Sequence, residues 1–375
     1  MAKKKFHVLD LFSGPGGLSL GFNTAKKAGL SFKSVVANDN NLNVSQTFSK
    51  NNPDVEFILG DISDAKIKKK IAKSVKEKTG NQGIDVIIGG PPCKGFSLTN
   101  KMTRNMDNPM NHLVMHYLDV IKTLKPKAFV MENVQGIFAM EKGKLVDYLI
   151  EQFKKLGYTN TTSWLLNAAD FGVPQIRKRA FIVGSLSKTP IEKPKPTHDS
   201  QSHISVYDAI SDLPKIPEGK TTTNSTYRRP PNKFQKTLRN GEKKPSQHVT
   251  TQNSEIVLKR IKTVPPGGNW KDIPLELMQV NGDYKKIHKA HSMIYKRLIK
   301  TEPSVTITNF RKGMIVHPTE NRLFSIREAA RIQTFPDSYE FEGGLSEMQQ
   351  QVSDAVPILL ARKVAESILS HLNNS

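Results

Sequence analysis

The chain has 375 residues, of which 56 are Lys or Arg and 34 are Asp or Glu, so its formal net charge is +22 at pH 7. Its single cysteine excludes an intramolecular disulfide and disfavours a cysteine-rich zinc site. No apolar stretch reaches the roughly 18–20 residues that cross a bilayer, and the N-terminus lacks the apolar segment of a signal peptide. We therefore expect a soluble, cytoplasmic protein of about two domains. Its positive charge favours a polyanionic partner, nucleic acid first, although a solvated basic surface is the alternative.

The first half of the sequence alternates apolar strands with segments of helical length. Strands are predicted at residues 6–12, 34–37, 55–59, 85–88 and 128–131. Helices are predicted from the first glycine turn to about residue 28, at 65–78 and at 111–124. This alternation predicts an α/β fold with an open, doubly wound and mostly parallel sheet. Polar residues follow the carboxyl ends of these strands, which is where ligands bind in such folds.

The composition changes after about Gly184. Residues 188–300 are rich in Pro, Thr, Asn and Lys, and they carry 22 Lys or Arg against 10 Asp or Glu, a net +12. A disordered insert could have this composition, but Trp270, Phe234 and the apolar run at 256–261 indicate a small folded module. Helical periodicity then returns at residues 326–334 and 355–372.

Glycines gather after the first predicted strand, in DLFSGPGGLSLGF. They let the backbone turn tightly and approach a ligand, and the following helix N-terminus favours polar or anionic groups. A dinucleotide-binding fingerprint would need glycine where Ser19 stands, and the Gly-Lys-Ser/Thr of a P-loop is absent. A turn around a nucleoside cofactor remains.

Two aspartates follow the next two strands. Asp39 can accept hydrogen bonds from ribose hydroxyls, and Asp61 can read an adenine amino group. Either aspartate alone would more often be a helix cap. Together with the glycine turn, at three successive strand ends, they favour a cofactor such as S-adenosylmethionine.

The only cysteine, Cys93, stands in GGPPCKGFSL after the fourth predicted strand. A phosphatase loop would need arginine where Thr99 stands, and no histidine is marked by its context as a papain-type partner. Glu132 ends the neighbouring strand, and Arg177 and Arg179 occur in GVPQIRKR. A thiolate, an acid and guanidinium groups are suited to adding a nucleophile to an electron-poor ring.

Six motifs resemble, in the same order, those of the C5-cytosine DNA methyltransferase family. They are DLFSGPGG, GGPPCKGFS, VMENVQGI, GVPQIRKRAFIVG, RLFSIREAARIQTFPD and QVSDAVP, and they cover roughly residues 6–185 and 303–360. The resemblance implies a Rossmann-like S-adenosylmethionine-dependent methyltransferase fold for a catalytic domain at 1–187. It also implies a smaller, loop-rich DNA target-recognition domain at 188–302 and a C-terminal segment at 303–375 that returns to the catalytic domain.

The resemblance assigns catalytic roles to four of these residues. Cys93 is expected to attack C6 of cytosine, Glu132 to engage N3 and the exocyclic amine, and Arg179, with Arg177, the O2 edge. Those atoms are buried in a duplex, so the base must be flipped out. C5 would then take the methyl group of the cofactor, and loss of the C5 proton and of the thiolate would release 5-methylcytosine.

The resemblance also assigns ligand contacts. The residues expected around S-adenosyl-L-methionine are Phe12, Gly14, Gly16, Gly17, Asp39, Asn40, Asp61, Ile62, Pro92, Asp354 and Ala355. The residues expected to contact DNA are Lys94, Ser97, Arg228 and Arg229, and no metal is expected. The implied partners are double-stranded DNA and, as in restriction–modification systems, a cognate restriction endonuclease acting on the same site. The chain itself is expected to be a monomer.

Some positions depart from the family pattern. The residues concerned are Lys94 for the usual glutamine, Asn40 for an aromatic residue, Met110 for arginine, and Ser353-Asp354 for Gly-Asn. None of these changes removes the nucleophile, the acid or the arginine. Two alternatives share parts of this pattern: a tRNA C5-cytosine methyltransferase, and a non-enzymatic DNA-binding relative. The first usually has a shorter, differently patterned central region, and the second would lose the catalytic residues.

Overall fold

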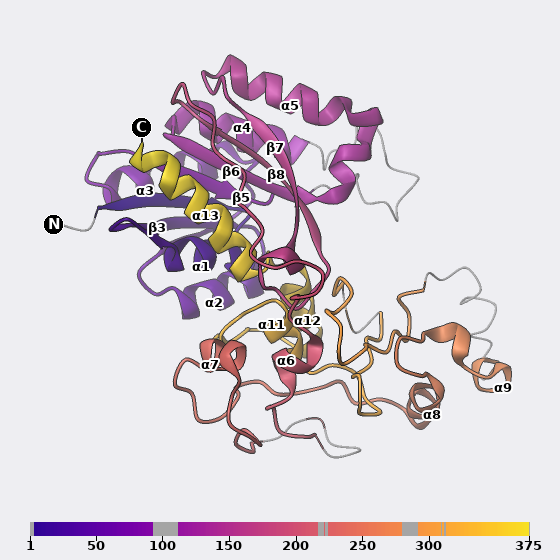
Figure 1. Cartoon of the computed structure of the whole chain (residues 1–375). Helices are drawn as coiled ribbons and strands as arrows, with labels where there is room; N and C mark the ends of the chain where they lie inside the picture. Colours follow the sequence, from indigo (N-terminus) through magenta and orange to yellow (C-terminus); the bar gives the residue numbers. More distant parts are fainter. Residues whose placement is uncertain are drawn as a thin grey trace. The chain divides into compact units, whose positions relative to one another are not determined.

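The computed structural model describes residues 4–92, 112–216, 221, 224–279, 292–308, 310 and 313–374. The chain divides into two compact units (Figure 1). The first unit comprises Met1–Phe171, Lys178–Thr197 and Val356–Ser375. The second unit comprises Gly172–Arg177 and His198–Ala355.

The first unit is built on a sheet that has eight strands within the described residues. They are β1 Lys5–Leu11, β2 Lys26–Lys27, β3 Leu30–Asp39, β4 Glu56–Leu59, β5 Val86–Gly89, β6 Ala128–Val134, β7 Thr162–Asn167 and β8 Lys178–Ser185. Their order is β2-β3-β1-β5-β6-β8-β7, and β4 pairs with the second half of β3. Strands β4, β3, β1, β5 and β6 are parallel, while β8 runs antiparallel to both β6 and β7. The predicted mostly parallel sheet is confirmed.

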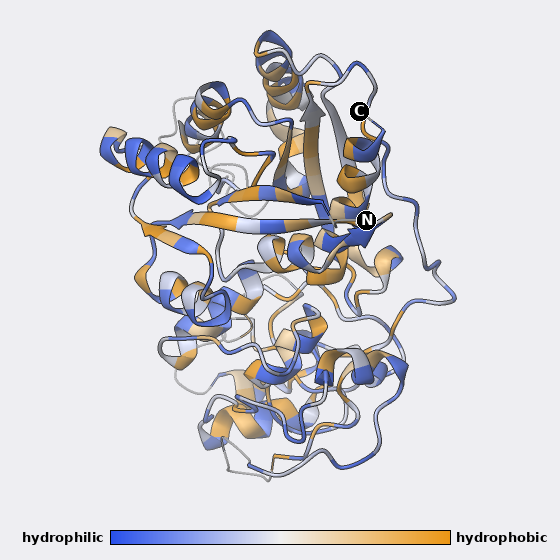
Figure 2. Ribbon diagram, turned by 90° about the vertical axis from the view of Figure 1, so that its left-hand side faces the viewer, coloured by the Kyte–Doolittle hydropathy of each residue, from blue (hydrophilic) through white to orange (hydrophobic). Residues whose placement is uncertain are grey.

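Helices surround this sheet (Figure 1). They are α1 Gly17–Thr24, α2 Leu42–Asn51, α3 Ala65–Lys78, α4 His112–Leu124, α5 Lys144–Lys155 and α13 Ile358–Asn373, with short 3-10 helices η3 Gln135–Gly143 and η4 Ala168–Phe171. Helices α3, α4 and α5 share one hydrophobic core with Leu9 and Leu11 of β1. Side chains alternate along a strand, so Asp10 points to the other face, where it contacts Ser19 of α1. Figure 2 shows hydrophobic residues along the strands and hydrophilic residues on the outer sides of helices.

The second unit has short helices and long connecting loops. Its helices are α6 Val206–Ile210, α7 Lys233–Arg239, α8 Glu255–Thr263, η5 Trp270–Asp272, α9 Leu275–Met278, α11 Ile326–Ile332 and α12 Leu345–Asp354. A hydrophobic cluster that includes Ile261, Tyr295 and Leu323 packs against Trp270. This cluster confirms the small folded module that the tryptophan and the apolar run predicted.

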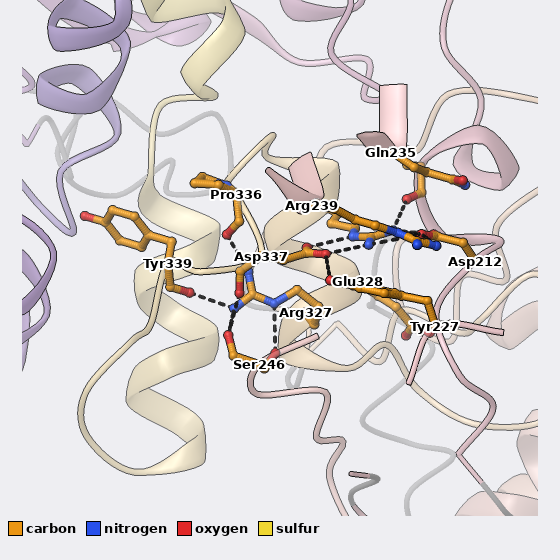
Figure 3. Close-up of polar contacts among 12 residues, drawn as sticks. Asp212, Tyr227, Gln235, Arg239, Ser246, Arg327, Glu328, Pro336, Asp337 and Tyr339 are labelled. Atoms are coloured by element: carbon orange, nitrogen blue, oxygen red, sulfur yellow. Dashed lines mark hydrogen bonds and ion pairs between the residues drawn. The ribbon is translucent and has the colours of Figure 1, made fainter. Parts of the chain in front are cut away.

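A buried network of charged residues holds the second unit together (Figure 3). Arg331 of α11 is fully buried, and its guanidinium pairs with the carboxylates of Asp212 and Asp337, the latter at 2.6 Å. The Tyr227 hydroxyl donates a hydrogen bond to Asp337 at 2.5 Å, and the Arg239 guanidinium lies 3.6 Å from the centre of the Tyr227 ring. Side chains far apart in the sequence are thereby fixed together.

The same network bears on the expected domain boundary. The second unit extends to Ala355, and the first unit resumes at Val356, whereas the expected C-terminal segment begins at residue 303. The reason is that α11 bonds to the preceding region: Arg331 pairs with Asp212, and Arg327 donates to the Ser246 carbonyl at 2.9 Å. The catalytic and target-recognition domains stay predictions. Among the described residues, none of the helices has the length and apolar character that a membrane crossing requires.

Candidate active site

The glycine turn after β1 is tied to the carboxyl end of β3. The Ser13 amide donates to the Asn38 carbonyl at 3.1 Å, and the Gly14 amide donates to Asp39 Oδ2 at 3.0 Å. Phe12 and Gly14 both have φ of 53°, in the left-handed region that glycine tolerates best. A Cβ on Gly14 would meet no atom within 4 Å, so this side of the turn is open to a ligand.

Two further glycines of the motif have backbone roles, and their expected contact with the cofactor stays a prediction. Gly16 has φ of 92° and begins α1, and its amide donates to the Ser13 carbonyl at 3.1 Å. A Cβ on Gly17 would lie 2.4 Å from the carbonyl oxygen of Val356, so a larger residue would push α1 away from the segment that leads into α13. The tight packing of this turn therefore depends on glycine.

Asp39 and Asp61 lie at the carboxyl ends of neighbouring strands. Asp39 Oδ1 accepts a hydrogen bond from the Asn41 amide at 3.1 Å, and Asp61 Oδ1 accepts one from the Ser63 amide at 2.8 Å. The hydrogen bonds from Ser63 lower the pKa of Asp61, so this exposed carboxyl is ionised at neutral pH. Asn38 joins the two strand ends, since its side-chain amide donates to the Gly60 carbonyl at 3.0 Å.

The helix-cap alternative for both aspartates is wrong. Helix α2 is capped by Asn41, whose side chain accepts from the Val44 amide, and α3 is capped by Asp64, whose side chain accepts from the Lys66 amide. Asp39 and Asp61 are therefore not the N-cap residues of α2 and α3. Next to them, Asn40 is exposed and Ile62 is buried.

Glu132 near the end of β6 forms an ion pair with Arg179 of β8. Arg179 Nε lies 3.0 Å from Glu132 Oε1, and the two side chains are 13% and 12% exposed. The antiparallel pairing of β6 and β8, with Val134 opposite Arg179, brings the two side chains together. A carboxylate and a guanidinium that are mostly shielded from water interact more strongly than a surface pair.

The same carboxylate lies beside the segment that precedes Cys93. A Cβ on Gly90 would be 3.1 Å from Glu132 Oε2, so glycine lets the acid approach the backbone here. The next residue, Asn133, is buried, and its side-chain amide donates to the Pro91 carbonyl at 3.0 Å. The end of β6 therefore positions the Gly-Gly-Pro-Pro segment.

Arg177 lies in the second unit, among backbone carbonyls. Its guanidinium is 2% exposed and donates to the carbonyls of Ile307 at 3.1 Å, Ser353 at 2.8 Å and Ala355 at 3.2 Å. Arg179 is the arginine that contacts Glu132. The hydrogen bonds of Arg177 give it a structural role, and its expected catalytic role stays a prediction.

The remaining predicted site residues are dispersed. Pro92 is the last described residue before the nucleophile segment, and Cys93, Lys94, Ser97 and Met110 lie outside the described residues. In the second unit, Asp354 is exposed and accepts from the Gln350 side chain at 2.7 Å, whereas Ala355 is buried. The hydroxyl of the atypical Ser353 donates to the Thr308 carbonyl at 2.7 Å.

Arg228 and Arg229 are exposed in the second unit. Arg228 Nε donates to the Ser211 carbonyl at 2.8 Å, and Arg229 donates to the Tyr207 hydroxyl at 2.7 Å. Both backbones follow Tyr227, which the buried network fixes. Among the described residues, no group of three or more His, Cys, Asp or Glu side chains is arranged to hold a metal ion.

Sequence reasoning assigned no role to Asn38, Asn133 or Asp10. Each is a polar residue inside or at the end of an otherwise apolar strand, and that contrast is the signal that could have identified them. Asp10 Oδ2 accepts from the Ser19 hydroxyl at 2.7 Å, and burial raises the pKa of Asp10 to about 7. It lies two residues before Phe12 and contacts α1, the helix that follows the glycine turn.

Comparisons with known proteins show the family and the fold of the chain. The family model described as C-5 cytosine-specific DNA methylase matches residues 6–370. The chain is 35% identical to the type II methyltransferase M1.HphI of Haemophilus parahaemolyticus, over 98% of this chain and 87% of the relative. It is 36% identical to M.DdeI of Desulfomicrobium norvegicum, over 98% and 89%. A crystal structure described as a DNA modification methyltransferase encoded within an E. coli prophage has the same fold, with a TM-score of 0.74, 24% identity, and coverage of 98% and 99%.

Proposed function

The chain belongs to the C-5 cytosine-specific DNA methylase family, and from this premise we propose a covalent mechanism. Cys93 attacks a cytosine that has been flipped out of duplex DNA, and S-adenosyl-L-methionine is the methyl donor. The observation that supports the mechanism most directly is the position of Glu132: its carboxylate lies beside Gly90, next to the segment that leads to Cys93, and pairs with Arg179 at 3.0 Å.

The proposed reaction needs one nucleophile, one acid and one cation. The Cys93 thiolate forms a bond to C6 of cytosine, while Glu132 holds N3 and Arg179 the O2 edge, where negative charge develops. The electron-rich C5 would then take the methyl group from the sulfonium sulfur of the cofactor, whose carbon–sulfur bond would break and leave a neutral thioether. A base removes the C5 proton, the C6–sulfur bond breaks, and the thiolate is regenerated together with 5-methylcytosine.

Base flipping follows from the atoms involved. N3 and the exocyclic amine of cytosine are paired with guanine in a duplex, and stacking covers the faces of C5 and C6. A site that must reach all of these atoms has to take the base out of the helix. The free energy of unstacking is a few kcal/mol, which contacts to the extruded base must offset.

The residues at the strand ends fit the implied cofactor. Gly14 leaves open space on its side-chain side, and the carboxylates of Asp39 and Asp61 stand at adjacent strand ends. Asp39 would accept hydrogen bonds from the ribose hydroxyls, and the ionised Asp61 would accept one from the adenine amino group. The cofactor, when bound, supplies an electrophilic methyl group.

The partner of the second unit is double-stranded DNA in this proposal. Residues 188–302 carry 22 Lys or Arg against 11 Asp or Glu, which is half of the net charge of +22, and Arg228 and Arg229 are exposed there. Lys and Arg suit phosphates, and arginine or asparagine suits base edges. The relatives are named type II methyltransferases, and a cognate restriction endonuclease acting on the same site is part of the proposal, as is a monomeric enzyme.

The mechanism can be tested by trapping. Duplex DNA with 5-fluorocytosine at the target should form a stable adduct, because fluorine at C5 blocks the final elimination. The chain has one cysteine, so mass spectrometry should locate the adduct on the peptide that contains Cys93. Cys93→Ser should lose both the adduct and turnover while still binding DNA. Near-normal turnover by this variant would exclude the covalent mechanism, and methylation of tRNA in place of DNA would exclude the substrate.

Target recognition can be tested with two chimeras. One exchanges residues 188–302 with those of a family member of different specificity, and the other exchanges residues 198–355, the continuous part of the second unit. Bisulfite sequencing of a methylated plasmid reads out the target. Either exchange should move methylation to the donor's site. A folded, active chimera that still marked the original site would contradict the assignment.

A further inference from the structure

Helix α3 is unusually rich in lysine. It contains seven lysines and one glutamate in 14 residues. Its apolar side is formed by Ile67, Ile71 and Val75, which are spaced by four residues and pack into the core of the first unit. The helix is therefore held by its apolar side, and the opposite side is available to solvent.

Most of the lysines lie on the opposite side of the helix. At about 100° per residue they fall within an arc of about 120°, and they span about 15 Å along the axis. All are exposed. We refer to this set as the lysine face: Lys66, Lys69, Lys70, Lys73 and Lys76.

Few carboxylates lie close enough to neutralise the positive charge of the lysine face. Within the part of the chain that the structure describes, Lys73 is the one member that pairs with a carboxylate, that of Glu77 at 3.8 Å. The two lysines outside the face are paired, Lys68 with Asp119 at 2.6 Å and Lys78 with Glu56 at 3.9 Å. Carboxylates thus neutralise the flanks of the helix and leave the face positive.

This arrangement costs stability to the isolated helix. Lysines spaced by three or four residues repel one another. Lys66 lies in the first turn, which has no acidic residue and where the helix dipole disfavours a cation. A local arrangement that opposes folding is a common mark of a functional surface. A polyanion on the face would relieve both costs.

We propose that the lysine face binds the phosphate backbone of duplex DNA outside the target base pairs, without regard to sequence. The inference rests on the proposed function, which supplies the duplex. Lys66 follows Asp61 by five residues, so the face begins at the carboxyl edge of the sheet and extends away from it. Lysine ammonium groups are compact charges that bind phosphates and read no bases.

An anionic membrane is the rival partner, and the composition of α3 argues against it. A helix that lies on a membrane buries bulky apolar residues beside its basic ones. The apolar residues of α3 face the protein core instead. Duplex DNA is therefore the partner that fits the lysine face.

The test compares two quadruple variants of the full chain. One is Lys66→Gln/Lys69→Gln/Lys70→Gln/Lys76→Gln, because glutamine keeps helix propensity and removes charge. The matched control is Lys5→Gln/Lys26→Gln/Lys27→Gln/Lys33→Gln, which changes exposed lysines of β1, β2 and β3. Both variants lower the net charge by the same amount.

Binding to a duplex of about 40 base pairs is measured by fluorescence anisotropy across a range of salt concentrations. Each lost phosphate contact reduces the slope of log K against log salt by about 0.9, so the lysine-face variant should lose about 2–4 from its slope. The control variant should keep its slope. Turnover at saturating DNA and affinity for S-adenosylmethionine should be unchanged in both variants.

Equal slopes for the two variants would overturn the proposal, since net charge alone would then account for any loss of affinity. Loss of binding to phosphatidylserine vesicles with an unchanged DNA slope would also overturn it, in favour of a membrane. Methylation of the same duplex by the wild-type chain tests the proposed function separately. If the wild-type chain did not methylate the duplex, the salt slopes of the two variants could still be compared.

Discussion

Replacing Asp10 by asparagine should remove a pH dependence from the stability of the first unit. The Asp10 carboxyl is fully buried in β1, and its Oδ2 accepts from the Ser19 hydroxyl at 2.7 Å. Its Oδ1 has no hydrogen-bond partner among the residues that the structure describes. Burial raises the pKa of Asp10 from 3.8 to about 7, and the negative charge of Asp39 adds to this effect. The hydrogen bond from Ser19 acts in the opposite direction.

The sign and size of the effect follow from these pKa values. Because the folded protein binds this proton more tightly than the unfolded chain, the stabilisation is fully present below pH 3.8 and is lost as pH rises through about 7. A difference of roughly 3 units at about 1.4 kcal/mol each corresponds to about 4 kcal/mol in total. Of this, about 2–3 kcal/mol is lost between pH 5 and pH 8.

Asparagine keeps the shape of Asp10 and carries no charge at any of these pH values. Its buried NH₂ group adds a constant cost of about 1–3 kcal/mol. The unfolding free energy of Asp10→Asn relative to wild type should therefore rise by about 2–3 kcal/mol from pH 5 to pH 8. Urea unfolding followed by Trp164 fluorescence reports on the first unit, once the other tryptophan is removed by Trp270→Phe.

Ser19→Ala is the matched control because it removes the donor that lowers the pKa of Asp10. It should increase the loss of stability at high pH, which is the opposite of the change in Asp10→Asn. If wild type and Asp10→Asn lost stability in parallel between pH 5 and pH 8, the reasoning about a buried titrating carboxyl would be refuted.

Three further changes test the site and its support. Asp39→Ala should weaken S-adenosylmethionine binding by about 1–3 kcal/mol, measured by calorimetry without DNA, since hydrogen bonds to a charged group are lost; an unchanged affinity would remove it from the cofactor site. Glu132→Gln should lower kcat by roughly 10²–10⁴-fold in single-turnover assays with little change in DNA affinity, and a similar loss in affinity instead would point to a binding role. Arg331→Met should destabilise the second unit by about 3–5 kcal/mol in urea unfolding, because the buried Asp212 and Asp337 lose the cation that they share and, among the described residues, keep only Arg239 and Tyr227 as polar partners; a loss below about 1 kcal/mol would contradict this interpretation of the network.

Local patterns in the sequence predicted much of the first unit. Helix α3 has the predicted bounds, and β1 differs from its prediction by one residue at each end. Such elements are set by residues close in sequence, through apolar periodicity and caps. Strands β7 and β8 were not predicted. The antiparallel pairing of β8 with β6 and β7 depends on contacts between distant residues, which no local pattern encodes.

Some residues of the candidate site could be predicted from local sequence, and others could not. Asp39, Asp61 and Glu132 follow apolar runs, so their place at the carboxyl edge could be predicted from sequence. The different environments of Arg177 and Arg179 could not be predicted. Both are arginines of the same short motif, and their partners differ only in the folded protein, where β8 carries Arg179 to Glu132. The boundary at Ala355 likewise depends on long-range ion pairs of Arg331.

The buried network in the second unit has a consequence for how target preference can evolve. Its ion pairs join Arg331, Asp212 and Asp337, all with fully buried side chains, whereas Arg228 and Arg229, proposed to contact DNA, are exposed. Substitutions of exposed side chains usually change stability by less than about 0.5 kcal/mol. Lineages can therefore sample new DNA preferences at the exposed positions one mutation at a time, while selection for a folded protein holds the buried ion pairs constant.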